Sequence, residues 1–236
     1  MNRALPEYRV RQSSRARHVN LTINPTDGLV VVVPRGFDER LIPGLVHEQR
    51  AWIDARLEDF AHLRNNETGR RRPEYVSLPA VNEHWAIDYH PNNSARVRIT
   101  AGKADVLRIT GADGNGPALQ AALRRWLKRR AQQYLTPRLA ELATVHDFNF
   151  ERVTIRHQRS RWGSCSTRGT ISLNAKLMLV APKLVDHVLL HELCHTLHPH
   201  HGRSFYELLA DLEPDHRDKR AALHKTWANM PDWVLP

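Results

Sequence analysis

Residues 182–198 read PKLVDHVLLHELCHTLH, and this segment constrains the fold of the chain more than any other. Pro182 suits the first turn of a helix. Apolar residues then recur at helical spacing, at Val185, Leu189, Leu193 and Leu197. The pattern predicts a buried helix. Because His191 and His195 are four residues apart, both imidazoles project from one face of that helix, about one turn from each other.

Two histidines in this register can bind one metal ion. Glu192 lies about 100° further round the helix than His191, so its carboxylate can reach a metal-bound water without binding the ion. Zinc favours imidazole ligands. HELCH therefore predicts a zinc site with His191 and His195 as ligands and Glu192 as the general base. The alternative, three ordinary hydrogen-bonded helix residues, is disfavoured because burying such polar groups without a ligand is costly.

A catalytic zinc usually takes three protein ligands, so the sequence must supply one more. The candidates are His198, His200, His201, Glu207, Glu213 and His216. His198 is seven residues from His191, about 10.5 Å along a helix, which is too far for one tetrahedral ion. Pro199 ends the helix and Gly202 permits a turn, so spacing favours a histidine after the break. The two glutamates remain possible if the next helix packs across the first.

The bulk properties indicate a folded chain. No apolar run approaches the roughly 20 residues that a membrane-spanning helix needs, and no apolar stretch typical of an export signal follows the basic start. Two cysteines in 236 residues are too few for a disulfide scaffold. We therefore expect a cytoplasmic protein that does not enter a membrane. The formal charge of +10 favours anionic partners, nucleic acid among them.

The first half of the chain has the pattern of strands with one helix. Residues 19–33 indicate a strand, a turn at NPTDG and a second strand, and helical spacing over 38–63 predicts a helix with Asp38 as its N-cap. A polar loop is expected over 64–74. Three later alternating runs, at 85–89, 97–100 and 106–110, predict more antiparallel sheet. The GADGNG segment at 111–116 is the predicted linker between subdomains 1–110 and 117–236.

A long amphipathic helix is predicted after this linker, from Leu119 to Leu142, with Pro137 as a possible bend. One of its faces is basic, with Arg124, Arg125, Lys128 and Arg129. Such a face could contact phosphates, although a solvated charged face is the commoner meaning of the pattern.

Several segments together resemble the YgjP-like metallopeptidase family, relatives of the WLM and SprT-type zinc peptidases. They include RHQRSRWGSC, SLNAKLMLVAP, HVLLHELCHTLHPHHG and RSFY in the last third, and YRVRQSSRARHVNLTINPTDGLVVVVPRG near the start. The resemblance implies an HExxH-x5-H zinc site, with one Zn²⁺ held by His191, His195 and His201, and Glu192 as the catalytic base. His200 falls where the family motif is polar but not ligating.

The family's RxRWGSC segment matches Arg159 to Cys165. Gly163 and Ser164 interrupt a strand pattern, which indicates a bulge or a place where another backbone approaches. In zinc peptidases of this plan an edge strand above the helix receives the extended substrate, so Arg161, Trp162, Gly163 and Ser164 are candidate substrate-binding residues. For Trp162, packing in the core is the preferred interpretation. Cys165 and Cys194 are expected to be small buried residues rather than ligands.

We therefore expect an α+β fold: an N-terminal part rich in antiparallel sheet, then a zincin-like catalytic part with the HExxH helix. The expected activity is zinc-dependent hydrolysis of peptide bonds in a peptide or protein. The alternative is a nucleic-acid-associated protein, including a peptidase that acts on DNA-bound proteins, recruited by its basic surface. A metal-dependent hydrolase acting on another amide also remains open. The sequence does not indicate an oligomeric state.

Overall fold

The computed structural model describes residues 5–14, 16–24, 28–54, 72–102, 105–111 and 116–235. By their contacts, the residues divide into two compact units, 1–69 and 70–236. The division falls inside the predicted loop 64–74, of which residues 64–71 lie outside the described residues. It does not coincide with the predicted linker at 111–116. None of the described helices is long and apolar enough to cross a membrane.

The first unit contains a three-stranded sheet and a short helix. Strands β1 (Tyr8–Ser13), β2 (Asn20–Asn24) and β3 (Gly28–Pro34) pair in the order β1-β3-β2. The antiparallel pair β2 and β3 confirms the two predicted strands, whereas residues 25–27 of the predicted turn lie outside the described residues. Alternate residues of β3 (Leu29, Val31 and Val33) join Ile42, Val46 and Ile53 in a small core of this unit.

The predicted helix over 38–63 is interrupted. Asp38 caps a 3-10 turn, Glu39–Leu41, as its side chain accepts a hydrogen bond from the backbone N–H of Arg40. Helix α1 (Ile42–Glu48) follows, and the chain turns at Gln49 before residues 50–54 become helical again. Residues 55–63 lie outside the described residues.

The second unit begins with a four-stranded sheet. Its strands are β4 (Tyr75–Leu78), β5 (Glu83–Pro91), β6 (Arg98–Ala101) and β7 (Val106–Gly111), in the order β4-β5-β7-β6, and a 3-10 turn, η3 (Pro79–Val81), joins the first two. The predicted antiparallel pairing is correct for β4 with β5 and for β6 with β7, but not for every pair. Strand β5 runs parallel to β7, as β1 does to β3. Alternation of apolar residues indicates a strand but carries no information about its partner, which explains the error.

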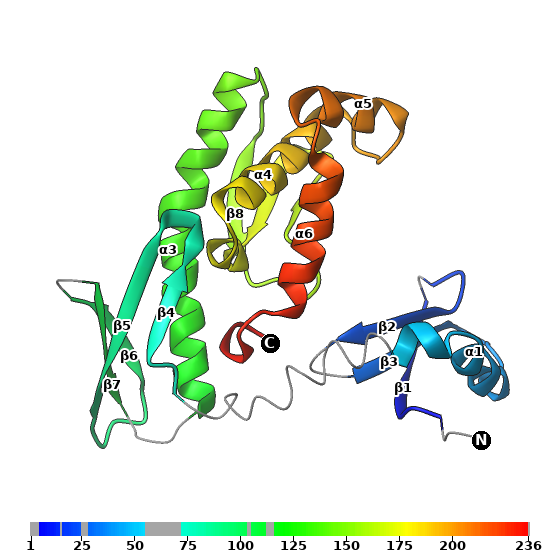
Figure 1. The fold of residues 1–236 in the computed structure, drawn as a ribbon, viewed down its shortest axis with the longest axis horizontal. Helices are drawn as coiled ribbons and strands as arrows, with labels where there is room; N and C mark the ends of the chain where they lie inside the picture. The colour runs from blue at the N-terminus through cyan, green and yellow to red at the C-terminus, as the bar shows by residue number, and fades with distance from the viewer. Residues whose placement is uncertain are drawn as a thin grey trace. The chain divides into compact units, whose positions relative to one another are not determined.

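Helix α3 (Gly116–Val145) packs beside this sheet (Figure 1). Pro137 lies within the helix. Trp126 of α3 meets Trp85 of β5 edge to face, with ring centroids 5.8 Å apart, and Arg130 pairs with Glu83. Leu107 of β7 belongs to the same core as α3. The sheet and the helix thus share one core, which is why the unit is not divided at 111–116.

The rest of the second unit builds a helical layer around a second small sheet. Strands β8 (Arg152–Arg156), β9 (Gly163–Cys165) and β10 (Thr170–Asn174) pair in the order β8-β10-β9. A 3-10 segment, η4 (Ala175–Leu179), leads to helices α4 (Pro182–Leu197), α5 (Arg203–Leu212) and α6 (His216–Ala228), and η5 (Asp232–Val234) follows. The whole is a mixed α+β fold.

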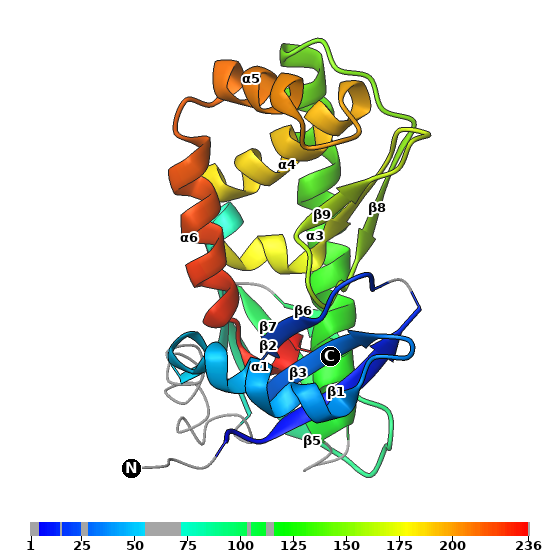
Figure 2. The same cartoon turned by 90° about the vertical axis from the view of Figure 1, so that its right-hand side faces the viewer.

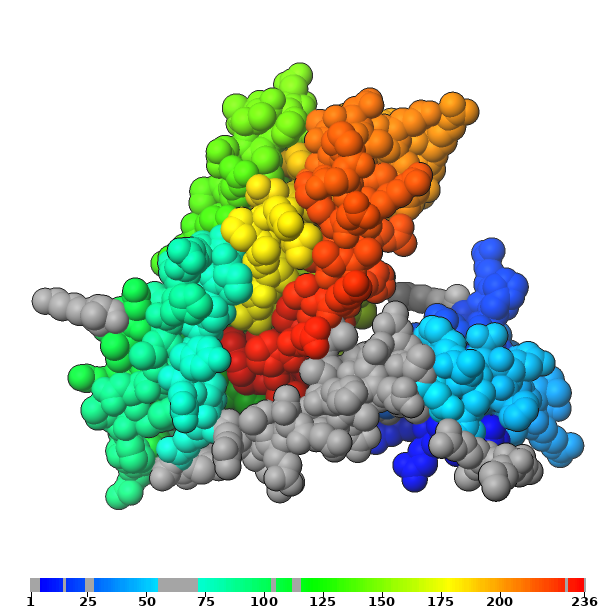
Figure 3. Space-filling view, in the orientation of Figure 1, coloured from blue at the N-terminus to red at the C-terminus, as the bar shows by residue number. Residues whose placement is uncertain are grey.

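Helix α4 is at the centre of this layer. It packs against α3, β9, α5 and α6. Figure 2 shows β9 on one side of α4 and α6 on the other, with α5 near one end. The start of α4, in yellow, reaches the surface between the β4–β5 strands and α6 (Figure 3). Helix α4 is thus in contact with β9, α5 and α6.

Candidate metal centre

The predicted helix over 182–198 is confirmed as α4, with Pro182 in its first turn. Val185, Leu189 and Leu193 are fully buried, whereas Leu197, the last residue of the predicted stripe, is 60% exposed. The buried face fixes the rotation of the helix. It places the rings of His191 and His195 together, with centroids 4.9 Å apart.

A third histidine meets these two. Helix α4 ends at Leu197, and the chain turns through residues 198–202 before α5 begins at Arg203. The Nε2 atom of His201 lies 3.0 Å from Nε2 of His191 and 3.1 Å from Nε2 of His195. Among the described residues, these three form the group whose ligand atoms could hold a metal ion, all within 4.8 Å of one another.

The tautomer of His195 can be assigned from its second ring nitrogen. Nδ1 lies 3.0 Å from the carbonyl oxygen of His198, which can accept but not donate a hydrogen bond. Nδ1 therefore carries a proton, which leaves Nε2 as the ring nitrogen that can present a lone pair to a metal ion. A backbone carbonyl in this role is common behind metal-binding histidines. His198 thus contributes to the site through its backbone carbonyl, which accepts the hydrogen bond from His195.

Phe205 of α5 forms an apolar base under the three rings. It is fully buried, and its ring stacks on His195 with a centroid distance of 4.6 Å. Its edge-to-face contacts with His191 and His201 have centroid distances of 4.9 and 4.8 Å. The sequence analysis did not identify this residue. The sequence feature that could have identified Phe205 is its position in the first turn of the helix that follows His201.

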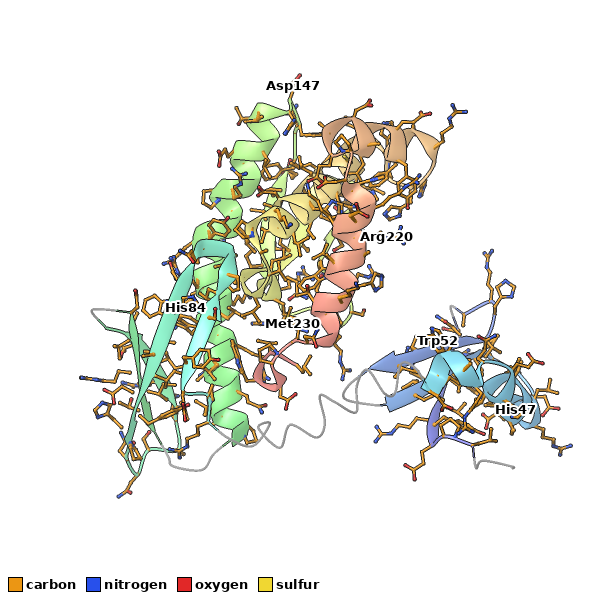
Figure 4. All side chains as sticks on the ribbon, in the orientation of Figure 1. His47, Trp52, His84, Asp147, Arg220 and Met230 are labelled. Atoms are coloured by element: carbon orange, nitrogen blue, oxygen red, sulfur yellow. The ribbon has the colours of Figure 1, made fainter. Side chains whose placement is uncertain are left out.

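The surroundings favour the neutral form of His191 and His201. Burial, together with the smaller effects of the neighbouring His195 and His201, lowers the pKa of His191 to about 3. Burial also lowers the pKa of His201. Arg220, on the first half of α6 (Figure 4), contributes to both shifts through its positive charge. Since only neutral imidazole binds a metal, these histidines are in the ligating form at neutral pH.

Glu192 lies beside this cluster as a buried carboxyl group. It is 5% exposed, and its Oε2 atom has no hydrogen-bond partner among the described residues. Burial raises the pKa of Glu192 to about 8, and the charge of Arg161 opposes this shift. A carboxylate with such a pKa takes up a proton readily near neutral pH, which is the property of a general base.

Gly163 of β9 packs directly against Glu192. A Cβ atom at position 163 would lie 2.6 Å from Oε1 and 2.8 Å from Cδ of Glu192. The predicted interruption of the strand is therefore wrong, because Gly163–Cys165 is a regular strand. What approaches the glycine is a side chain rather than another backbone.

Strand β9 has one free edge within the described residues. It is the outer strand of its sheet and pairs only with β10, in antiparallel register. The N–H of Asn174 donates to the carbonyl of Trp162, and the N–H of Ser166 donates to the carbonyl of Thr170. Hydrogen-bonded and non-bonded positions alternate in such a pair, so the backbone groups of Gly163 and Cys165 point to the free edge.

The remaining candidates have other positions. Trp162 packs edge to face on Trp227 of α6, with centroids 4.5 Å apart, as the core interpretation expected. Ser164 accepts a hydrogen bond from Gln158, and the Arg161 side chain is exposed. Both cysteines are free thiols, with Cys194 buried and Cys165 half-buried.

The other ligand candidates lie outside the cluster. His200 is exposed, and Glu207 pairs with Arg203 at 2.6 Å. Glu213 is buried and lies 2.6 Å from both Nδ1 of His187 and Nζ of Lys219. His216 is 8% exposed, and neither of its ring nitrogens has a hydrogen-bond partner among the described residues.

The donor set fits a metal ion. A tetrahedral ion with metal–nitrogen bonds of about 2.0–2.1 Å would place its ligand atoms about 3.3 Å apart, close to the observed separations. Without an ion, one proton shared among three converging ring nitrogens could not give each of them a hydrogen-bond partner. The Oε2 atom of Glu192, the residue that follows His191, is buried without a partner among the described residues, as expected of a group that receives a water molecule.

Comparison with known proteins agrees with this geometry. A sequence model of the YgjP-like metallopeptidase domain matches residues 17–226, which is most of the chain and includes all three histidines and Glu192. A search of curated proteins gave no significant match. The chain belongs to the YgjP-like metallopeptidase family, as the motifs of its last third predicted.

Proposed function

We propose that this protein is a zinc-dependent peptidase in which His191, His195 and His201 hold one Zn²⁺ ion and Glu192 is the general base. The observation that carries the proposal is the convergence of three imidazole Nε2 atoms, 3.0–3.1 Å from His201 to its two neighbours, with the buried Glu192, whose Oε2 has no partner among the described residues, next to His191 in the chain. Zinc is proposed because three imidazoles and an open fourth position are its usual catalytic ligand set.

Each residue has a separate task in hydrolysis. Bound zinc lowers the pKa of a water molecule and polarises the carbonyl group of the substrate. Glu192 takes a proton from the attacking water and passes it to the nitrogen of the leaving amine, while the C–N bond breaks. Its raised pKa allows it to accept the proton and then to release it.

The substrate is proposed to bind in an extended form along β9. The free N–H and C=O groups of Gly163 and Cys165 can pair with a peptide backbone, as an added strand does. Such pairing places the peptide next to Glu192, because Gly163 and Glu192 are in contact. Arg161 is exposed one residue before Trp162 and close enough to lower the pKa of Glu192, so it can contact the substrate. Trp162 supports the strand by packing instead.

The test separates metal binding from proton transfer. Glu192→Gln keeps the shape of the side chain but removes the base, so we expect full zinc content and a loss of peptide hydrolysis by about 10²–10⁴-fold. Glu207→Gln on α5 is the matched control, because Glu207 is exposed and belongs to a surface ion pair with Arg203. It should retain both properties. Hydrolysis by Glu192→Gln at the wild-type rate would refute the proposed base.

A further inference from the structure

Lys176, in η4 behind the candidate site, is buried without a carboxylate partner. It is 1% exposed, and no ion pair to it is present among the described residues. Its Nζ atom donates to the carbonyl of Gln158 at 3.3 Å and lies 4.6 Å from the ring centre of Trp227. Burial lowers the pKa of the Lys176 ammonium group to about 8.

A lysine buried in this way lowers the stability of the fold, so its presence calls for another role. A buried charge loses its hydration, and one backbone carbonyl with one aromatic ring replaces that hydration only in part. An apolar side chain of similar length would fit the same space at lower cost. Conflicts of this kind between a residue and its surroundings concentrate at functional sites.

Asn174 works beside Lys176 on the same stretch of backbone. It is fully buried, and its Nδ2 donates to the carbonyls of Gln158 at 3.0 Å and Arg161 at 2.7 Å. Its Oδ1 accepts a hydrogen bond from the backbone N–H of Lys176. The two side chains together hold the segment from Gln158 to Trp162, which has no regular secondary structure of its own.

This segment leads directly into β9. Trp162, its last residue, is fixed between the backbone N–H of Asn174 and the ring of Trp227, on which Lys176 also rests. The next residue is Gly163, whose close contact leaves Glu192 little freedom to move. A displacement of the segment would therefore move both the Glu192 carboxylate and the strand edge along which the substrate is proposed to lie.

We propose that Lys176, together with Asn174, is a positioning residue of the peptidase site, which fixes the Gln158–Trp162 segment and through it β9 and Glu192. Lys176 does not touch the substrate, because it is buried. Only the predicted effect of Lys176 on catalysis rests on the proposed function. The effect of Lys176 on the order of the Gln158–Trp162 segment can be measured even if the protein has no peptidase activity.

The test is Lys176→Met, which has a similar length and no charge. We expect full zinc content, an unchanged or higher melting temperature, a kcat/KM for an extended peptide lowered at least about 10-fold, and faster amide hydrogen exchange over residues 158–165 than in wild type. Lys176→Arg, which restores charge and donors, should recover part of the activity. Lys183→Met is the matched control, because Lys183 is exposed on α4, and it should behave as wild type.

The outcomes separate the hypotheses. Wild-type kcat/KM and wild-type exchange in Lys176→Met would overturn the inference. So would a loss of activity that merely follows a loss of zinc or of folding, both in Lys176→Met and in the milder variant Lys176→Gln, because the lysine would then be only structural. If zinc-loaded wild type cleaves no peptide, the proposed function fails, and hydrogen exchange alone still decides whether Lys176 orders the segment.

Discussion

Gly163 packs so close to Glu192 that a Cβ at position 163 would lie 2.6 Å from Oε1, and this contact predicts the effect of one methyl group. In Gly163→Ala the added Cβ would overlap Oε1, Cγ and Cδ of Glu192, so the carboxylate must move. We expect zinc content to remain and kcat to fall by about 10²-fold, as a displacement near 1 Å commonly causes. Gly44→Ala is the control, since nothing lies within 4 Å of a Cβ there. Unchanged kcat in Gly163→Ala would show that the contact does not hold Glu192.

At the scale of single residues, the sequence predicted those residues whose role follows from their spacing. The i, i+4 histidines and the adjacent glutamate follow from helix geometry alone, and the break at Pro199 favoured His200 or His201 as the third ligand, with Glu207 and Glu213 still possible. Phe205 and Lys176 were missed. A phenylalanine or a lysine has no spacing rule, and its contact with the site depends on how separate elements pack.

At the scale of elements, Phe205 links helix α5 to the histidines of α4 and to the histidine of the turn that follows α4. Phe205→Ala should lower the free energy of unfolding by about 3–5 kcal/mol and also weaken zinc binding. Phe148→Ala is the matched control, as Phe148 is a buried core residue of the same unit with no ring contact to the histidines among the described contacts. Chelator competition and urea unfolding of both variants check this. Equal zinc affinity in the two variants would contradict the role of Phe205.

The elements themselves were predicted unevenly. The helices now seen as α3, α4 and α5, and the β2–β3 hairpin, were expected because each has a clear period or turn signal. Strand β4 and the η4 segment were not recognised, because four or five residues give too short a pattern. The parallel pairs β1–β3, β5–β7 and β8–β10 are set by long-range contacts that no local pattern encodes.

For the whole molecule, the second unit carries every residue of the candidate site together with its own core. A chain of residues 70–236 should therefore fold, bind one zinc ion and retain peptidase activity. Circular dichroism, zinc analysis and a peptide assay against the full-length protein check this. A fragment that folds but binds no zinc would show that residues 1–69 contribute to the site.

Part of the predicted basic face of α3 makes hydrogen bonds within the protein. Arg124 donates to the carbonyls of Trp233 and Leu235, and Arg125 donates to the carbonyl of Val97 at 3.5 Å. Lys128 and Arg129 remain exposed on the predicted basic face. Recruitment by nucleic acid stays a prediction, and a gel shift that weakens with salt would support it.

The central claim is a single zinc ion held by His191, His195 and His201. Its most direct measurement is the zinc content of the purified wild-type protein beside His201→Ala and His200→Ala. We expect one zinc per chain in wild type and in His200→Ala, because His200 lies outside the cluster, and a loss of zinc in His201→Ala. Wild-type protein without zinc after incubation with the metal, or full zinc in His201→Ala, would contradict the claim.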